Sequence, residues 1–341
     1  MLFAKKLRRV ARRMMFVVLD GLARLGRMGG PARLAQFGRG VGAFHYAVSF
    51  RRRRRLTRHV ARALGLGSTQ EAAEILRSSY RSGDRAILEV IAMCGEAVPG
   101  AWIDESMRVE GLARLRNAVD DGTGVVLIGM HMGNGVLLAA WLARHGVPVS
   151  LVHRQSQKMP QGALARCIEL HGVEGICARQ RERAYREMVR ALKRGRVLFV
   201  LMDQDSKHGG IPVRMLGKDV EIAAGPPALA LRTGAPLMTA FATDDSPGWS
   251  FRIGMPLDRG DSLEQAGAAI AQAMDSHIRA HPHMWTWHHR RWRNYPFPPE
   301  SARDTHHSPT PISVNGGIRA TADAGSPMAR PEKEISSTSS W

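Results

Sequence analysis

From residue 125 onward, short apolar runs alternate with segments of helical periodicity. Runs of this kind, rich in Val, Ile and Leu, are typical of buried strands. They predict strands at 125–130, 147–153, 175–178, 197–202, 237–243 and 250–254. The intervening segments predict helices at 136–145, 161–171, 181–194, 226–232 and 262–280. Strands separated by helices of about 10 to 15 residues predict an α/β fold whose central sheet is mostly parallel and flanked by helices.

The chain before residue 125 has a mainly helical pattern. Ser68 to Glu71 form a capping box, S-T-Q-E, and apolar residues at helical spacing follow it to about Met93. Residues 102–109 predict an edge strand. From residue 301 the chain is rich in Ser, Thr, Pro and Gly, which predicts a disordered tail. The expected organisation is therefore a helical arm at 1–62, an α/β domain at 63–300 and a tail at 301–341.

Positive charge is concentrated in the N-terminal segment. Residues 1–62 carry 17 Lys and Arg but a single acid, Asp20, and therefore hold most of the net charge of +19. Apolar residues interleave with these cations, which predicts a basic amphipathic arm lying in an anionic membrane surface. The longest apolar run, Met14 to Leu19, is far shorter than the about 20 residues that span a bilayer. The expected membrane contacts are Met14, Met15, Phe16, Arg51, Arg52 and Arg53.

Two other interpretations of this basic segment stay open, a nucleic-acid-binding segment and an ordinary solvated face. No helix-turn-helix, zinc or RNP pattern accompanies it in the sequence, so no nucleic-acid partner is expected.

The three cysteines, Cys94, Cys167 and Cys177, lack metal-ligand spacing, which predicts a reducing compartment and no disulfide framework. No convincing cleavage site follows the apolar run, so no export is expected.

The candidate for catalysis follows the first predicted strand of the sheet. The run Val125 to Ile128 ends in a glycine-rich segment that contains one histidine, His131. Ligands in open α/β sheets gather at the carboxyl ends of strands, and imidazole titrates near neutral pH, so His131 is a candidate general base. Gly133 and Gly135 would let a substrate approach the backbone. The alternative is a turn histidine bonded to the backbone.

Three further blocks carry polar side chains. Arg154 follows the strand predicted at 147–153, with a surface ion pair as its alternative role. Asp203 and Asp205 follow the strand predicted at 197–202, where Asx turns are the alternative. Two carboxylates alone are weak evidence for a metal, and none is expected. The last block is W-T-W-H-H-R-R-W at 285–292, whose tryptophans could equally pack in the core or at a membrane interface.

Taken in order, these motifs resemble the bacterial lipid A biosynthesis acyltransferases, the lauroyl and myristoyl acyltransferases of the lysophospholipid acyltransferase superfamily. The resemblance covers roughly residues 45–297. It is carried by the basic run Arg51 to Arg55, H-x-G-N at 131–134, Arg154, D-Q-D at 203–205, the stretch Gly225 to Ala230 with Gly234 to Pro236, and W-x-H-R-R at 287–291.

The resemblance implies transfer of a fatty acyl group from acyl carrier protein to a hydroxyl of a lipid A precursor or related amphiphilic acceptor. It places this reaction at the cytoplasmic face of the inner membrane and implies no cofactor. His131 would deprotonate the acceptor hydroxyl. Backbone N–H groups around Gly133, Asn134 and Gly135 would hold the oxyanion. The substrate site, including the acceptor phosphates, would involve Arg154, Gly209, Gly210, Trp287, His289 and Arg290.

Position 136 departs from the family pattern H-x-x-x-x-[DE], because it is Val where the resemblance implies an acid that orients His131. Losing such an orienting group costs about four orders of magnitude in the serine-protease example. Asp203 or Asp205 would replace the acid, since parallel strands end at one edge of the sheet. Two alternatives are an unassisted base and a catalytically inactive homologue that binds lipid or acyl carrier protein as a scaffold or regulator.

Overall fold

The computed structural model describes residues 17, 20–21, 23–24, 27–94, 98–154, 162–206 and 209–289. The predictions made for Met14, Met15, Phe16, Arg290 and the tail at 301–341 lie outside these residues.

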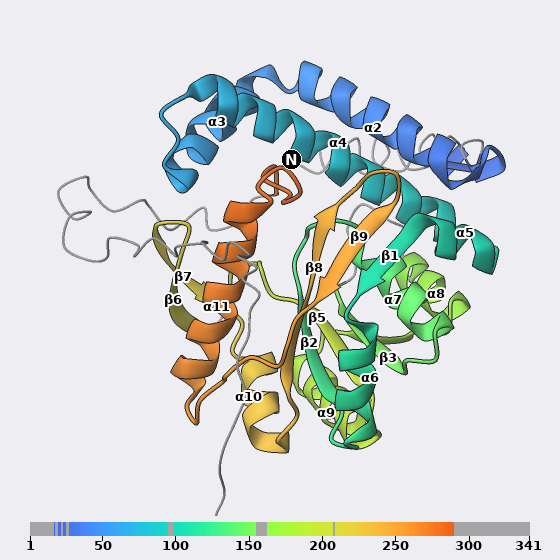
Figure 1. Ribbon diagram of the computed structural model, residues 1–341, viewed down its shortest axis with the longest axis vertical. Helices are drawn as coiled ribbons and strands as arrows, with labels where there is room; N and C mark the ends of the chain where they lie inside the picture. The colour runs from blue at the N-terminus through green and yellow to red at the C-terminus, as the bar shows by residue number, and fades with distance from the viewer. Residues whose placement is uncertain are drawn as a thin grey trace, which may run out of the picture. The chain divides into compact units, whose positions relative to one another are not determined.

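A seven-stranded sheet forms the centre of the fold, in the order β1-β9-β8-β2-β5-β3-β4 (Figure 1). Every neighbouring pair is parallel except β8 and β9. The predicted α/β class with a mostly parallel sheet is therefore confirmed. The strands are β1 (Met107–Glu110), β2 (Val125–Gly129), β3 (Val149–His153), β4 (Glu174–Cys177), β5 (Val197–Leu201), β8 (Leu237–Asp244) and β9 (Trp249–Ile253).

The helices between these strands cover the sheet and lie close to the predicted positions. β2 is buried along its whole length, as its unbroken apolar sequence requires. α7 packs against α8, and α9 packs against α10, which in turn contacts α11. These helices are α6 (Leu112–Asp120), α7 (Gly135–Arg144), α8 (Ala163–Leu170), α9 (Arg181–Lys193), α10 (Gly225–Thr233) and α11 (Leu263–Ala280).

Two segments differ from the prediction. The strand expected at 102–109 is a short helix, α5 (Gly100–Ser106), followed by β1, because Trp102, Ile103 and Ser106 turn inward with helical spacing. The hairpin of β6 (Ile211–Met215) and β7 (Lys218–Ile222) was not predicted. Its two-residue turn places Leu216 and Gly217 at φ of 50° and 73°. Hairpin turns of this kind are signalled by Asn-Gly or Asp-Gly, and Leu-Gly lacks that signal.

Three helices form a layer across the end of the sheet at which β2 and β8 finish (Figure 1). They are α2 (Gly30–Val48), α3 (Phe50–Leu64) and α4 (Thr69–Cys94). Gly38 and Gly42 let α2 approach α4 closely, since a Cβ at Gly38 would lie 2.7 Å from the Cα of Arg85. The predicted domain boundary at residue 62 falls inside α3. In the part of the chain that the structure describes, no helix is long and apolar enough to cross a membrane.

Candidate active site

A cavity of about 1540 Å³ lies between the helical layer and the carboxyl ends of β2, β3 and β5. Its walls are mostly apolar. α2 contributes Val41, Phe44 and Val48, and α4 contributes Ile87 and Ile91. Polar side chains that the sequence singled out also line this cavity. Those that line the cavity are His131, Asn134, Arg154, Asp205 and His289.

A carboxylate orients His131. The Nδ1 atom of His131 lies 2.7 Å from Oδ1 of Asp203, whose side chain is fully buried. The other carboxylate oxygen, Oδ2, accepts a hydrogen bond of 2.9 Å from the indole N–H of Trp285. Asp203 is therefore fixed by contacts on both of its carboxylate oxygens, and it contacts the nitrogen of His131 that an acid at position 136 was expected to orient. Of the two predicted candidates, it is Asp203, and not Asp205, that contacts the histidine.

The free edge of the imidazole faces the cavity. Because a carboxylate accepts at Nδ1, that nitrogen carries the donated hydrogen, and in the neutral imidazole Nε2 has the lone pair. The side-chain amide of Gln204 donates to Nε2 at 3.0 Å. Gln204 is exposed, so a substrate hydroxyl can replace its amide. This arrangement suits a general base that acts through Nε2.

The segment after α11 fixes the backbone of His131. The carbonyl oxygen of His131 accepts hydrogen bonds from the Thr286 amide at 3.1 Å and from the Thr286 hydroxyl at 2.6 Å. Met132 and Trp285 form an isolated bridge beside them. Together with the Trp285–Asp203 bond, these contacts clamp both members of the histidine–aspartate pair. Sequence reasoning missed the roles of Trp285 and Thr286, and the W-T-W pattern was their only signal.

The placement of Trp287 corrects its predicted role in substrate binding. Its side chain is buried, donates to the carbonyl of Pro282 at 2.7 Å and does not line the cavity. Trp285 and Trp287 pack edge to face, with ring centroids 4.6 Å apart. The alternative reading, core packing, therefore describes Trp287. His289 does face the cavity, and its ring centroid lies 5.2 Å from that of His131.

The loop between His131 and α7 presents backbone amides to the cavity. Gly133 has φ of 67°, and a Cβ there would lie 2.7 Å from the Cβ of Ala242, so glycine is required. Asn134 caps α7, since its Oδ1 accepts from the amide of Leu137 at 3.0 Å. Among the described residues, the amides of Gly135 and Val136 have no hydrogen-bond partner. A helix N-terminus with free amides can bind a negatively charged oxygen.

Basic side chains also line the cavity. Arg154 is exposed at the end of β3, and Arg181 and Arg186 of α9 line the same cavity. The sequence predicted Arg154 but missed the other two, because α9 carries many similar cations. These three guanidinium groups suit an anionic headgroup.

Two polar atoms of the cavity wall have no hydrogen-bond partner within the described part of the chain, Oδ1 of Asp205 and Nδ1 of His153. Burial lowers the pKa of His153.

Of the two glycines predicted to bind substrate, Gly209 lines the cavity and Gly210 does not. Gly210 packs against the carbonyl oxygen of Ile222, which would lie 2.5 Å from a Cβ at position 210. No group of three or more His, Cys, Asp or Glu arranged for a metal ion occurs among the residues described.

The arginines of the basic run in α3 do not all point to solvent, because some of them contact other parts of the protein. Arg51 is exposed, but Arg52 donates to the carbonyl of His288, and Arg53 lies 4.9 Å from the ring centroid of Tyr46. Successive residues of a helix point about 100° apart, so a run of five cations cannot all face outward. Arg52 and Arg53 are both partly exposed, and their predicted contact with the membrane stays a prediction.

The fold and the site together define the class: an α/β protein with a histidine–carboxylate pair in a large, mostly apolar cavity at the carboxyl edge of a parallel sheet. The chain belongs to the bacterial lipid A biosynthesis acyltransferase family, whose model matches residues 1–294. The family expected from the motifs is therefore confirmed, and it is a family of acyltransferases.

The chain is also similar to the phosphatidylinositol mannoside acyltransferase of Mycolicibacterium smegmatis. The two are 26% identical over 267 residues, which cover 77% of this chain and 86% of that relative. The protein of the same name from Mycobacterium tuberculosis (strain CDC 1551 / Oshkosh) is 28% identical over 191 residues, which cover 54% of this chain and 59% of that relative.

Proposed function

We propose that this protein is a membrane-associated O-acyltransferase that moves a fatty acyl group from a thioester to a hydroxyl of a glycolipid. The observation that carries the proposal is the pair of His131 and Asp203, 2.7 Å apart, with Nε2 of the histidine facing a cavity large enough for an acyl chain. A histidine oriented by a buried carboxylate is the arrangement that activates a hydroxyl nucleophile.

In the proposed reaction, Nε2 of His131 takes the proton of the acceptor hydroxyl, and the oxygen attacks the thioester carbonyl. Asp203 stabilises the imidazolium that forms. The amides of Gly135 and Val136 donate to the developing oxyanion. When the tetrahedral intermediate collapses, the carbon–sulfur bond breaks, and the imidazolium returns its proton to the leaving thiolate. The products are an ester and a free thiol.

For the substrates, we propose acyl carrier protein as donor and a phosphorylated glycolipid as acceptor. The family name gives lipid A biosynthesis, and the names of the relatives give a phosphatidylinositol mannoside. Both acceptors combine sugar hydroxyls with phosphate, and Arg154, Arg181 and Arg186 offer the charge that a phosphate requires. We place the reaction at the cytoplasmic face of the inner membrane, where such acceptors and the carrier meet.

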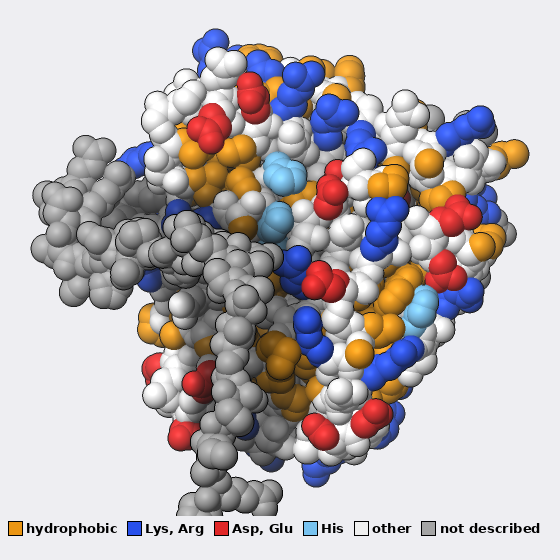
Figure 2. Space-filling model, in the orientation of Figure 1, with side chains coloured by type: hydrophobic (Ala, Val, Ile, Leu, Met, Phe, Trp, Pro, Cys, Tyr) orange, Lys and Arg blue, Asp and Glu red, His pale blue; other side chains and the backbone are white. Residues whose placement is uncertain are grey.

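The surface around the cavity suits a lipid bilayer. Phe44, Val48 and Phe50 are each more than half exposed, and Phe44 and Val48 also line the cavity. Arg51, Arg54, Arg55 and Arg58 of α3 are exposed beside them. Figure 2 shows Lys and Arg side chains together with apolar side chains over the upper part of the molecule, where Figure 1 places α2 to α4. Apolar side chains flanked by cations are typical of a surface that binds anionic lipid.

Changing Phe44 and Val48 together to serine should weaken binding to vesicles that contain anionic lipid by on the order of tenfold or more, because both apolar side chains lose their burial in the bilayer. Sedimentation with vesicles measures the partition. Met255→Ser is the matched control, since Met255 is 65% exposed but is not among the residues that line the cavity. Equal partition of the double variant and the wild type would argue against this surface.

Val136→Glu tests whether the missing family acid limits the enzyme. Val136 lines the cavity next to the free amides of α7, while Asp203 already occupies Nδ1 of His131. We therefore expect no gain in kcat, and a loss of up to about tenfold from a charge placed beside the oxyanion. Steady-state transfer assays at saturating substrates measure this. A large gain would instead favour the second candidate, an inactive scaffold or regulator that lost its acid at this position.

The test of the proposed function is a transfer assay with purified protein. Radiolabelled palmitoyl and lauroyl groups are supplied on acyl carrier protein or on coenzyme A, with lipid A precursor, phosphatidylinositol mannoside or a simple alkyl glycoside as acceptor. We expect an ester product with at least one phosphorylated glycolipid and faster transfer from the carrier protein. Transfer no faster than in the protein-free blank with every donor and acceptor pair would refute the proposal.

A further inference from the structure

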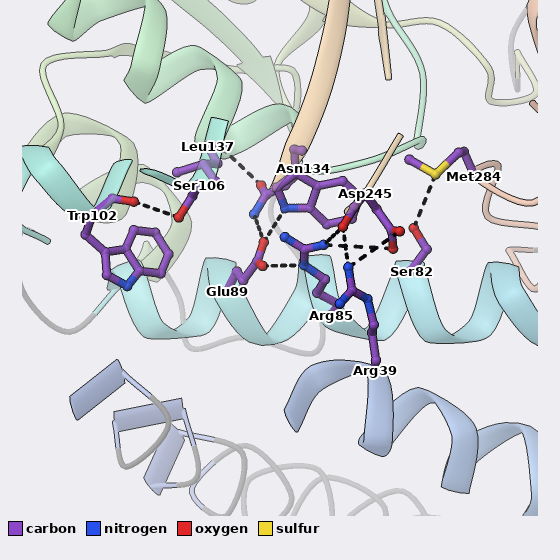
Figure 3. Close-up of polar contacts among 11 residues, drawn as sticks. Arg39, Ser82, Arg85, Glu89, Trp102, Ser106, Asn134, Leu137, Asp245 and Met284 are labelled. Atoms are coloured by element: carbon purple, nitrogen blue, oxygen red, sulfur yellow. Dashed lines mark hydrogen bonds and ion pairs between the residues drawn. The ribbon is translucent and has the colours of Figure 1, made fainter. Parts of the chain in front are cut away.

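A largely buried polar cluster lies behind the active-site loop, mostly outside the cavity. It consists of Arg39, Arg85, Glu89, Asn134, Asp245 and Trp249. Figure 3 shows Arg85 and Glu89 of α4 directed toward Asn134 and Asp245. Arg85 and Glu89 are 1% and 2% exposed. Of the cluster, only Asn134 is among the residues that line the cavity.

Glu89 is the centre of this cluster. One carboxylate oxygen, Oε1, accepts from Nε of Arg85 at 2.7 Å. The other, Oε2, accepts from the Asn134 amide at 3.0 Å and from the Trp249 indole at 2.5 Å. Three donors on three different segments therefore converge on one buried carboxylate.

Arg85 completes the charge balance. Its guanidinium group lies 4.2 Å from the ring centroid of Trp249 and donates to the carbonyl of Asp245. Arg39 of α2 contacts Asp245 as well, with a charged pair at 3.6 Å. The buried charges of Arg85 and Glu89 thus neutralise each other, as burial demands, while Arg39 and Asp245, 23% and 22% exposed, pair at the rim of the cluster.

The cluster fixes the orientation of the Asn134 side chain. Its amide nitrogen is held by Glu89, which directs its Oδ1 toward the amide of Leu137. Asn134 therefore caps α7 in one fixed orientation. The amides of Gly135 and Val136 follow immediately, and His131 lies three residues before Asn134 in the same loop.

A buried ion pair adds little net stability compared with apolar packing of the same volume. Burying Glu89 and Arg85 therefore calls for a reason other than stability. A carboxylate can accept from Asn134, Trp249 and Arg85 at once, and no apolar side chain can orient the asparagine in this way.

We infer that Glu89, with Arg85, is a positioning residue for acyl transfer: it fixes Asn134 and so sets the first amides of α7 relative to His131. This inference rests on the proposed function. Glu89 does not touch the substrate. It acts through Asn134, in the way that outer hydrogen-bond partners orient the groups that do the chemistry.

The test is a double-mutant cycle with Glu89→Gln and Asn134→Asp. Glu89→Gln directs an N–H donor at another donor, and Asn134→Asp directs a second carboxylate at Glu89. We expect each variant to lower kcat by about 10- to 100-fold with KM changed less than threefold. The rescue is tested in a Trp249→Phe background, because the Glu89 oxygen that faces Asn134 also accepts from the Trp249 indole. In that background the double variant restores a donor facing an acceptor between the two positions, so it should recover at least tenfold relative to the worse single variant.

Glu174→Gln is the matched control. Glu174 accepts hydrogen bonds from Arg194 and Ser150 near the amino ends of β3 and β4, at the opposite edge of the sheet. Removing its charge should leave kcat unchanged. All variants are assayed at a temperature at which circular dichroism shows them folded, which separates lost positioning from lost stability.

Hydrogen–deuterium exchange of residues 133–139 supplies a readout that does not depend on activity. We expect faster exchange in both single variants and slower exchange again in the double variant, with no change in Glu174→Gln. Unchanged exchange in Glu89→Gln, or an active wild type whose kcat survives Glu89→Gln, would overturn the inference. A wild type that transfers no acyl group would refute the proposed function, while exchange alone still decides whether Glu89 fixes α7.

Discussion

Replacing His131 with alanine should lower kcat for acyl transfer by about 10⁴-fold, with KM for both substrates changed less than threefold. The imidazole supplies the proposed base, and Gln204, its neighbour at Nε2, cannot accept a proton near neutral pH. Initial rates with labelled acyl carrier protein and a phosphorylated glycolipid measure the loss. Because the cavity keeps its apolar walls, substrate binding should persist.

His145→Ala is the matched control for this experiment. His145 follows the last residue of α7 and stacks on Trp141, at the end of the helix opposite the loop of His131. Its loss should leave kcat within twofold of the wild type. A His131→Ala variant that keeps a tenth or more of the wild-type kcat would exclude His131 as the base and direct attention to His289.

The position of the histidine–aspartate pair follows from features that can be read in the sequence. Asp203 directly follows an unbroken apolar run, and His131 follows another such run after Gly129 and Met130; both runs predict buried parallel strands. In the structure β2 and β5 are neighbours, and Gly129 pairs with Leu201. His131 and Asp203 each lie two residues beyond that pair, so the register of the sheet brings them together. The sequence alone left two candidates for the carboxylate that contacts His131, Asp203 and Asp205, because it does not show which residues of β2 and β5 pair.

Other features depend on contacts that no linear pattern encodes. Glu89 lies in a helix whose apolar spacing predicted packing, and its partners come from segments 45 and 160 residues further along the chain. The directions of Arg52 and Arg53 depend on how α3 is rotated against its neighbours. Trp287 belongs to a motif that suggested substrate contact, yet its burial follows from packing beside Trp285. The directions and partners of these side chains are determined by tertiary packing, which overrides local propensity.

Asp203→Asn should lower kcat by about 10³- to 10⁴-fold, again with little change in KM. Trp285 donates to one oxygen of Asp203, so an asparagine would direct its single oxygen to Trp285 and its NH₂ group to Nδ1 of His131. The imidazole would then have to accept at Nδ1 and carry its hydrogen on Nε2, which removes the lone pair that the proposed base requires. The same transfer assay measures the loss.

This explanation predicts a specific rescue. Adding Trp285→Phe to Asp203→Asn removes the competing donor, and the asparagine oxygen can turn to His131 and restore the original tautomer. The double variant should therefore be at least tenfold faster than Asp203→Asn alone, although Trp285→Phe by itself slows the enzyme. Asp205→Asn should cost less than tenfold, because Asp205 makes no contact with His131. If the double variant were instead slower than both Asp203→Asn and Trp285→Phe, Asp203 would act mainly through its charge, by stabilising the imidazolium, and less by selecting the tautomer.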